Sequence, residues 1–175
     1  MGDSGLTKPT NQIVVAGDPR AEIYKVETAT NMYAGRLVIK GTNDDDVIVG
    51  TAGGAVVGWL GYEHTARKHR PATVDTIYLQ NAQAAVLRGP GTVLVASIPA
   101  GQNIAKGDRL VAAADGQLTK ASGAIAPAGA TAVTAHTAAP TITGPVPTEG
   151  IVVAVAEESL NSGGSPADIM VRSLI

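Results

Sequence analysis

The chain has 175 residues, a formal net charge of −2 and 45% hydrophobic residues, which suits one compact domain with an arm. It contains no cysteine, which excludes disulfides, thiolate catalysis and cysteine-based zinc sites, and its basic residues form no long stripe of the kind that nucleic-acid binding needs. With no Phe, one Trp and four Tyr, the core must consist mainly of Ala, Val, Ile and Leu, which pack well on pleated sheets.

Residues 1–16 are expected to form an extended N-terminal arm. Residues 1–11 are rich in Gly, Ser, Thr and Pro, and we expect them to be flexible until a partner orders them. They contain no apolar signal core, and no apolar run approaches the roughly 20 residues of a membrane helix, so we expect a soluble protein with no membrane partner. The arm residues expected to contact a partner are Leu6, Lys8, Pro9 and Thr10.

Residues 17–175 are predicted to form a single all-β domain. Short apolar runs alternate with turn signals, of which Asp115-Gly116 is the clearest, because this dipeptide favours the primed turn that joins right-twisted strands. Many short strands without a long amphipathic helix indicate a sandwich or a small barrel. The expected strands are residues 13–16, 23–26, 36–40, 47–49, 55–60, 74–79, 84–88, 92–98, 109–113, 117–120, 151–156 and 168–174.

A long Ala/Thr/Pro-rich segment spans about residues 121–148. Its glycines, prolines and threonines argue against a helix, so we interpret it as a loop or insertion. Loops of this length are uncommon in compact domains, and we expect this one to contact a neighbouring molecule.

The acidic run Asp44, Asp45 and Asp46 is the one candidate for a metal site. With its flanking residues it resembles a single imperfect copy of a calcium-binding nonapeptide, but such repeats bind Ca²⁺ between successive copies, and the sequence has one. We therefore favour an acidic turn on the surface, and we expect no metal and no cofactor.

Two features are candidates for binding a protein partner. The basic cluster that includes Arg67, Lys68 and Arg70 is either a solvated loop or a salt-dependent contact with a neighbouring subunit. Trp59, the only tryptophan, belongs either to the core or to an interface, because aromatic side chains dominate both.

Nothing in the sequence indicates catalysis. No GxSxG motif is present, Ser97 has no histidine near it in sequence, and the glycines of residues 50–54 lack the Lys-Ser/Thr ending of a phosphate-binding loop. We therefore expect a protein that is not an enzyme.

Five segments occur in an order that we recognise. They are residues 55–61 (AVVGWLG), 98–110 (IPAGQNIAKGDRL), 114–119 (ADGQLT), 150–158 (GIVVAVAEE) and 168–174 (DIMVRSL). This order of strands and turns resembles that of the structural cement, or decoration, proteins of phage capsids, over about residues 50–175.

The resemblance implies a small β-barrel or β-tulip-like domain on the outer surface of a virion whose shell has the HK97-type fold. It also implies two protein partners, which are the major capsid protein and further copies of the same chain in a homotrimer. The protein would be made in the cytoplasm of the host.

Two other interpretations stay open. Residues 98–110 also resemble the SAF-like and biotinyl-like modules, which suggests a small β-clip domain that binds a ligand, although Lys106 lacks the setting of a cofactor-carrying lysine. A calcium-dependent adhesion module built around the acidic run is the third interpretation, and loss of structure in chelator would support it.

Overall fold

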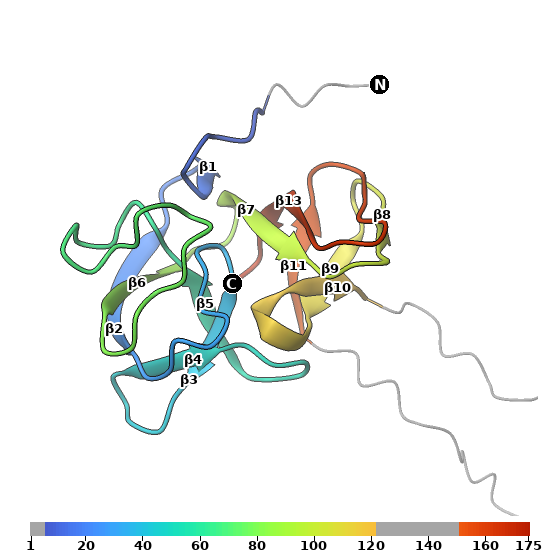
Figure 1. The fold of residues 1–175 in the computed structure, drawn as a ribbon. Helices are drawn as coiled ribbons and strands as arrows, with labels where there is room; N and C mark the ends of the chain where they lie inside the picture. Colours follow the sequence, from blue (N-terminus) through green and yellow to red (C-terminus); the bar gives the residue numbers. More distant parts are fainter. Residues whose placement is uncertain (1–5, 122–150) are drawn as a thin grey trace, which may run out of the picture.

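The computed structural model describes residues 6–121 and 151–175, and in this part of the chain the predicted all-β architecture with a small barrel is confirmed. Two lobes lie side by side, a closed five-stranded barrel and a six-stranded antiparallel sheet (Figure 1). Residues 122–150, which include nearly all of the predicted long loop, lie outside the described residues, as do residues 1–5. Among the residues described, no helix is long and apolar enough to cross a bilayer.

The barrel lobe closes through one parallel pair of strands. Lys25 and Val26 of β2 lie in register with Asp46 and Val47 of β4, and the other four pairs in the order β2-β4-β3-β5-β6 are antiparallel. Closure leaves no unpaired strand edge in this lobe. Its strands are β2 (Arg20–Val26), β3 (Leu37–Lys40), β4 (Asp46–Val49), β5 (Val56–Leu60) and β6 (Gln83–Arg88).

The second lobe is a sheet with the order β1-β7-β13-β11-β9-β10. A ribbon of two short strands, β8 and β12, lies beside it. A short turn, η1 (Ala114–Gly116), joins β9 to β10. The strands of this lobe are β1 (Val14–Ala16), β7 (Val93–Ile98), β8 (Asn103–Ile104), β9 (Arg109–Ala112), β10 (Leu118–Lys120), β11 (Val152–Ala156), β12 (Leu160–Asn161) and β13 (Ala167–Ser173).

Alternate residues of the barrel strands enter two different cores. Val38, Leu60 and Val86 fill the barrel, whereas their neighbours Trp59 and Leu87 pack against the six-stranded sheet. Because successive side chains of a strand point to opposite faces, strands buried on both faces read as continuous apolar runs. The second core therefore joins the two lobes.

Trp59 belongs to this shared core. Its side chain is 1% exposed, and its Nε1 donates a hydrogen bond of 3.1 Å to Oγ of Ser173 at the end of β13. Of the two roles that the sequence left open, the structure shows the core role, and the expectation that Trp59 binds a partner is corrected. Its bond to Ser173 ties the barrel to the sheet.

The strand predicted at residues 74–79 is absent, and this prediction was wrong. The segment forms turns and irregular chain between β5 and β6. Its backbone bonds with other partners: the Val74 N–H donates to Oδ1 of Asn11, and the Tyr78 N–H to the Met32 carbonyl. The buried Tyr78 ring, with its hydroxyl 2.5 Å from the Gly61 carbonyl oxygen, fixes the segment in place of a strand ladder.

The hairpin predicted around Asp115-Gly116 is confirmed. Strands β9 and β10 pair with Leu118 opposite Ala112, and both turn residues have positive φ, 56° for Asp115 and 65° for Gly116. Two consecutive residues with positive φ define the primed turn that the dipeptide favours.

Candidate partner-binding surfaces

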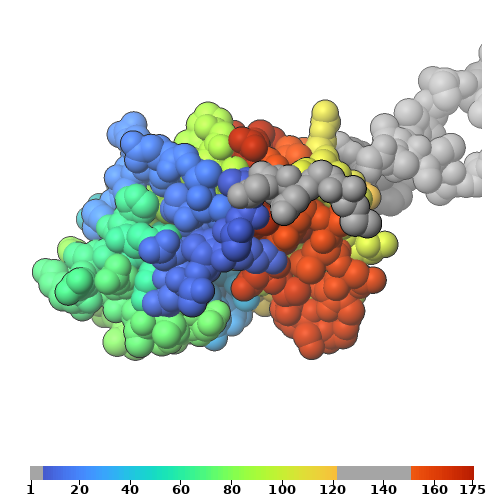
Figure 2. Space-filling model, turned by 90° about the horizontal axis from the view of Figure 1, so that it is seen from above, coloured from blue at the N-terminus to red at the C-terminus, as the bar shows by residue number. Residues whose placement is uncertain are grey.

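The described part of the predicted arm lies along the junction of the two lobes (Figure 2). The ammonium of Lys8 is 2.7 Å from a carboxylate oxygen of Glu158 and donates a 2.7 Å hydrogen bond to the main-chain carbonyl of Asp168. Leu6 and Pro9 are half-buried, whereas Thr10 is exposed. Polar contacts therefore hold this segment to the six-stranded sheet.

The arm runs directly into the sheet. Residues 14–16, which the sequence analysis assigned to the arm, form β1 and pair with β7. At the start of this strand, one oxygen of Glu63 accepts hydrogen bonds from the backbone N–H groups of Ile13 and Val14, at 2.7 and 2.9 Å. Glu63 therefore anchors the start of β1 to the loop that follows β5.

The basic cluster lies on that same loop. Arg67 and Lys68 are exposed, whereas Arg70 is half-buried with its guanidinium 5.0 Å from the centre of the Tyr62 ring. The exposed side chain of Leu79 lies next to the cluster, in a shallow groove that Lys68 and Arg70 help to line. This surface combines positive charge with apolar area and stays available to a partner.

The acidic run has a structural role at one of its three residues. Asp46 is 2% exposed, and it pairs with Lys25 at 2.9 Å and accepts a 2.6 Å hydrogen bond from Nδ2 of Asn43. The hydrogen bond from Asn43, and then that from Lys25, hold the pKa of the Asp46 carboxyl below its ordinary value. Within residues 6–121 and 151–175, no three His, Cys, Asp or Glu side chains form a group that could hold a metal ion.

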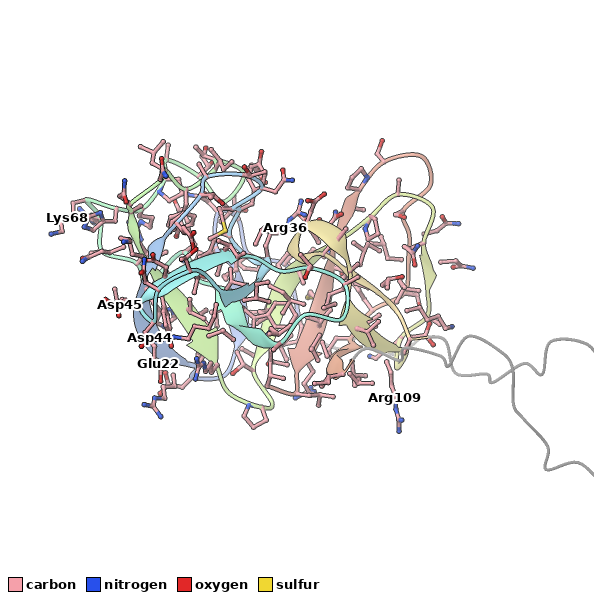
Figure 3. All side chains as sticks on the ribbon, turned by 90° about the horizontal axis from the view of Figure 1, so that it is seen from below. Glu22, Arg36, Asp44, Asp45, Lys68 and Arg109 are labelled. Atoms are coloured by element: carbon pink, nitrogen blue, oxygen red, sulfur yellow. The ribbon has the colours of Figure 1, made fainter. Side chains whose placement is uncertain are left out.

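Asp44 and Asp45 remain exposed at the end of the barrel that is remote from the six-stranded sheet. Lys68 lies at the same end (Figure 3). Of the residues singled out in the sequence, the structure places the acidic turn and Lys68 at this end of the barrel, whereas Arg70 of the basic cluster lines a pocket together with Thr10 of the arm.

In residues 98–110, the segment that resembles a ligand-binding module, the Gly-Asp motif makes contacts within the chain. Oδ2 of Asp108 accepts a 2.8 Å hydrogen bond from the Ala105 N–H and pairs with Lys120 at 2.7 Å, which closes the turn before β9. The bond from Lys120, and then that from Ala105, lower the pKa of Asp108. The Gly-Asp motif therefore shapes the turn between β8 and β9 and ties it to β10.

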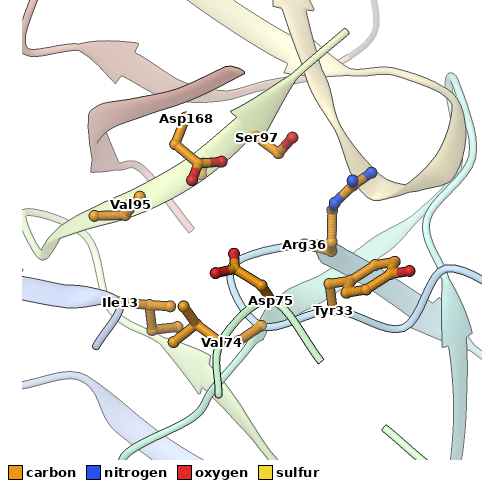
Figure 4. A pocket seen from close by; sticks show the side chains of 10 residues that line it. Ile13, Tyr33, Arg36, Val74, Asp75, Val95, Ser97 and Asp168 are labelled. Carbon is orange, nitrogen blue, oxygen red and sulfur yellow. The ribbon is translucent and has the colours of Figure 1, made fainter. Parts of the chain in front are cut away.

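A pocket of about 200 Å³, which no sequence pattern indicated, lies at the junction of the lobes (Figure 4). It forms where the loop between β2 and β3, the loop between β5 and β6, and strands β7 and β13 meet. Gly35 permits this contact, because its φ is +77° and a Cβ atom there would lie 2.5 Å from the Val95 carbonyl oxygen. The lining residues are Ile13, Tyr33, Ala34, Arg36, Val74, Asp75, Val95, Ala96, Ser97 and Asp168.

Two carboxyls face this pocket from different lobes. Desolvation by the surrounding protein, followed by the nearby charge of Asp75, raises the pKa of the Asp168 carboxyl above its ordinary value, although Lys8 and Arg36 act in the opposite direction. Asp168 lies opposite Ser97 in the β13–β7 ladder, whereas Asp75 comes from the loop that was wrongly predicted as a strand. Residues so far apart in sequence are brought together only by the fold.

Comparison with known proteins gives a match to a protein family and matches to solved structures. Residues 7–163 match the family described as "Structural cement protein (E217 gp24/Pam3 gp6)". No protein of curated function matches the sequence. Among solved structures, the N base of the head fibre protein gp8.5 of bacteriophage phi29 is similar with a TM-score of 0.43 and 15% identity, over 90% of this chain and 98% of that one.

Proposed function

The chain belongs to the phage structural cement protein family, and from that premise we propose that it binds the outer surface of an icosahedral phage head and stabilises the shell through contacts between subunits. The family match over residues 7–163 is the observation that carries the proposal. The chain is a phage structural protein associated with the capsid, and the outer surface and the stabilisation are the parts that we propose.

The arrangement of the two lobes supports a mechanical role. The shared core around Trp59 makes the barrel and the sheet one packed unit, which can transmit load between the molecules on either side of it. Many copies on a shell would add avidity, because each bound contact raises the effective concentration of the next.

The proposed partners are the major capsid protein of an HK97-type shell and further copies of this chain in a homotrimer. Exposed polar and apolar groups of the arm and of the basic cluster are the proposed contacts, with Lys8, Arg67 and Lys68 as the residues to test first. Contacts through exposed cations weaken as salt screens them, so binding should decrease with ionic strength.

The proposed role involves no catalysis. The pocket at the junction of the lobes is lined by no histidine, and the hydroxyl of its one serine, Ser97, accepts a hydrogen bond from the Gln117 amide at 3.2 Å. A binding role accounts for the arrangement without a nucleophile or a general base.

The test uses phage shells that lack the protein. The purified full-length chain is added at increasing ratios, binding is measured by co-sedimentation, and the melting temperature of the shells is followed by calorimetry. We expect saturable binding and a raised shell melting temperature, and reduced binding for the double variant Arg67→Gln/Lys68→Gln. Failure to bind shells at any ratio would refute the proposal.

A further inference from the structure

We propose that copies of this chain bind one another through the end of the barrel remote from the six-stranded sheet, where a basic groove of one copy receives the acidic turn of the next. The basic groove is the one that Lys68, Arg70 and Leu79 line, and the acidic turn is residues 42–46 with the neighbouring Ile23. Lys68 and the exposed aspartates of the turn lie at this same end (Figure 3). The inference rests on the proposed function for its partner, a further copy of the chain, and it assigns the surfaces through which the copies meet.

The basic groove has an apolar centre and cations at its rim. The side chain of Leu79 is 73% exposed, and the half-buried Ile77 lines the same groove, which has a volume of about 230 Å³. Within the described residues no carboxyl lines this groove, and neither Lys68 nor Arg70 forms an ion pair. Protein interfaces combine an apolar core with a polar rim in this way, and a partner here must supply negative charge.

The acidic turn offers the complementary combination. Ile23 is 55% exposed, and it lines a hollow together with Asp44 and Asp45, which are also exposed. In the part of the chain that the structure describes, neither aspartate forms an ion pair. A large aliphatic side chain thus lies beside negative charge on this surface and beside positive charge on the other.

Negative charge stays in surplus around the acidic turn, although two lysines lie beside it. Lys25 pairs with the buried Asp46 at 2.9 Å, and the Lys40 ammonium donates a hydrogen bond to the main-chain carbonyl of Asp44. The turn and the side chains bonded to it hold four carboxylates and two ammonium groups, a surplus of two negative charges: Glu27, Asp44, Asp45, Asp46, Lys25 and Lys40. The turn therefore complements the groove in charge, which favours a second copy as its occupant.

Glu27 holds the two surfaces at a fixed separation. Its main-chain carbonyl accepts a 2.9 Å hydrogen bond from the side-chain amide of Gln80, next to Leu79, and its carboxylate accepts 2.6 Å bonds from the N–H and the hydroxyl of Thr42. Surfaces that are ordered before binding lose little conformational entropy when they meet. Because the groove and the turn differ, the contact is heterologous, and copies that use both can close into a ring, as a homotrimer requires.

The test measures the solution mass of the full chain by light scattering and sedimentation over a range of concentrations, without shells. We expect an oligomer that weakens as salt is added. Lys68→Glu and Asp45→Lys should each weaken association about tenfold, which corresponds to ~1.4 kcal/mol. The double variant Lys68→Glu/Asp45→Lys should restore it, because the two charges then exchange sides. Leu79→Ser should weaken association at every salt concentration.

The matched control is Lys106→Glu, which reverses an exposed lysine in the turn between β8 and β9 and should leave association unchanged. A chain that is monomeric at the highest concentration reached, or an oligomer that neither charge reversal weakens, would overturn the inference. In the latter case a mass of three chains would leave the proposed homotrimer intact. A dimer that shows the expected losses and the rescue would support the contact and refute the homotrimer.

Discussion

Removing the Ser173 hydroxyl tests the tie between the two lobes. In Ser173→Ala, Nε1 of Trp59 loses its acceptor while its ring stays 1% exposed, so a buried donor is left without a partner. Such a loss costs about 1–3 kcal/mol. For a chain of this size, each kcal/mol lowers the melting temperature by roughly 2–4 °C.

Urea unfolding followed by circular dichroism measures this cost, and the exposed Ser165→Ala is the matched control, with an expected change within ~0.5 kcal/mol. The stronger test repeats Ser173→Ala in a Trp59→Phe background. Phenylalanine has no donor to leave unsatisfied, so the second substitution should cost at least ~1 kcal/mol less there. The other bonds of the Ser173 hydroxyl, to the backbone of Ile175, are lost in both backgrounds and cancel. Equal costs in the two backgrounds would show that the indole bond does not tie the lobes.

Three further predictions concern other contacts. Thr65→Val removes the hydroxyl that accepts the Ala85 N–H at 2.9 Å, and should destabilise the barrel by about 1–3 kcal/mol in urea unfolding. The pKa of Asp108 is lowered by Lys120, so its contribution to stability is present above an unfolded-state pKa of about 3.9 and is lost as the pH falls through the lower folded-state value. Asp108→Asn should therefore be less stable than the unaltered chain at pH 7 and should approach it near pH 2, as thermal melts across this range would show. Glu63→Ala leaves the two N–H groups at the start of β1 without their acceptor, and should speed the hydrogen exchange of β1 relative to β7, whereas equal exchange would contradict the assigned anchor.

Local chemistry made much of the fold predictable from sequence. Asp115-Gly116 specifies its hairpin through the φ preferences of two adjacent residues, and the apolar runs around Leu60 and Val86 identify strands buried on both faces. These strands can be predicted without knowing which distant segments they pair with.

The strand prediction that was wrong and the pocket that was missed both depend on contacts between residues that are far apart in the sequence. Residues 74–79 were predicted as a strand, but their backbone N–H groups find acceptors in loops, among them Asn11 and Met32. The pocket joins Asp75 to Asp168, which are 93 positions apart (168 − 75) and share no motif. Such a site has no local signal in the sequence.

The position of β13 in its sheet has a consequence for how the protein is made. This strand comes last in the sequence, yet it lies between β7 and β11 and pairs with both. During synthesis the barrel strands, all within residues 20–88, can pair early, whereas β7 and β11 must wait with open edges until β13 leaves the ribosome. Unpaired edges of this kind template aggregation, so folding yield in the host should depend on how quickly the last strand is inserted.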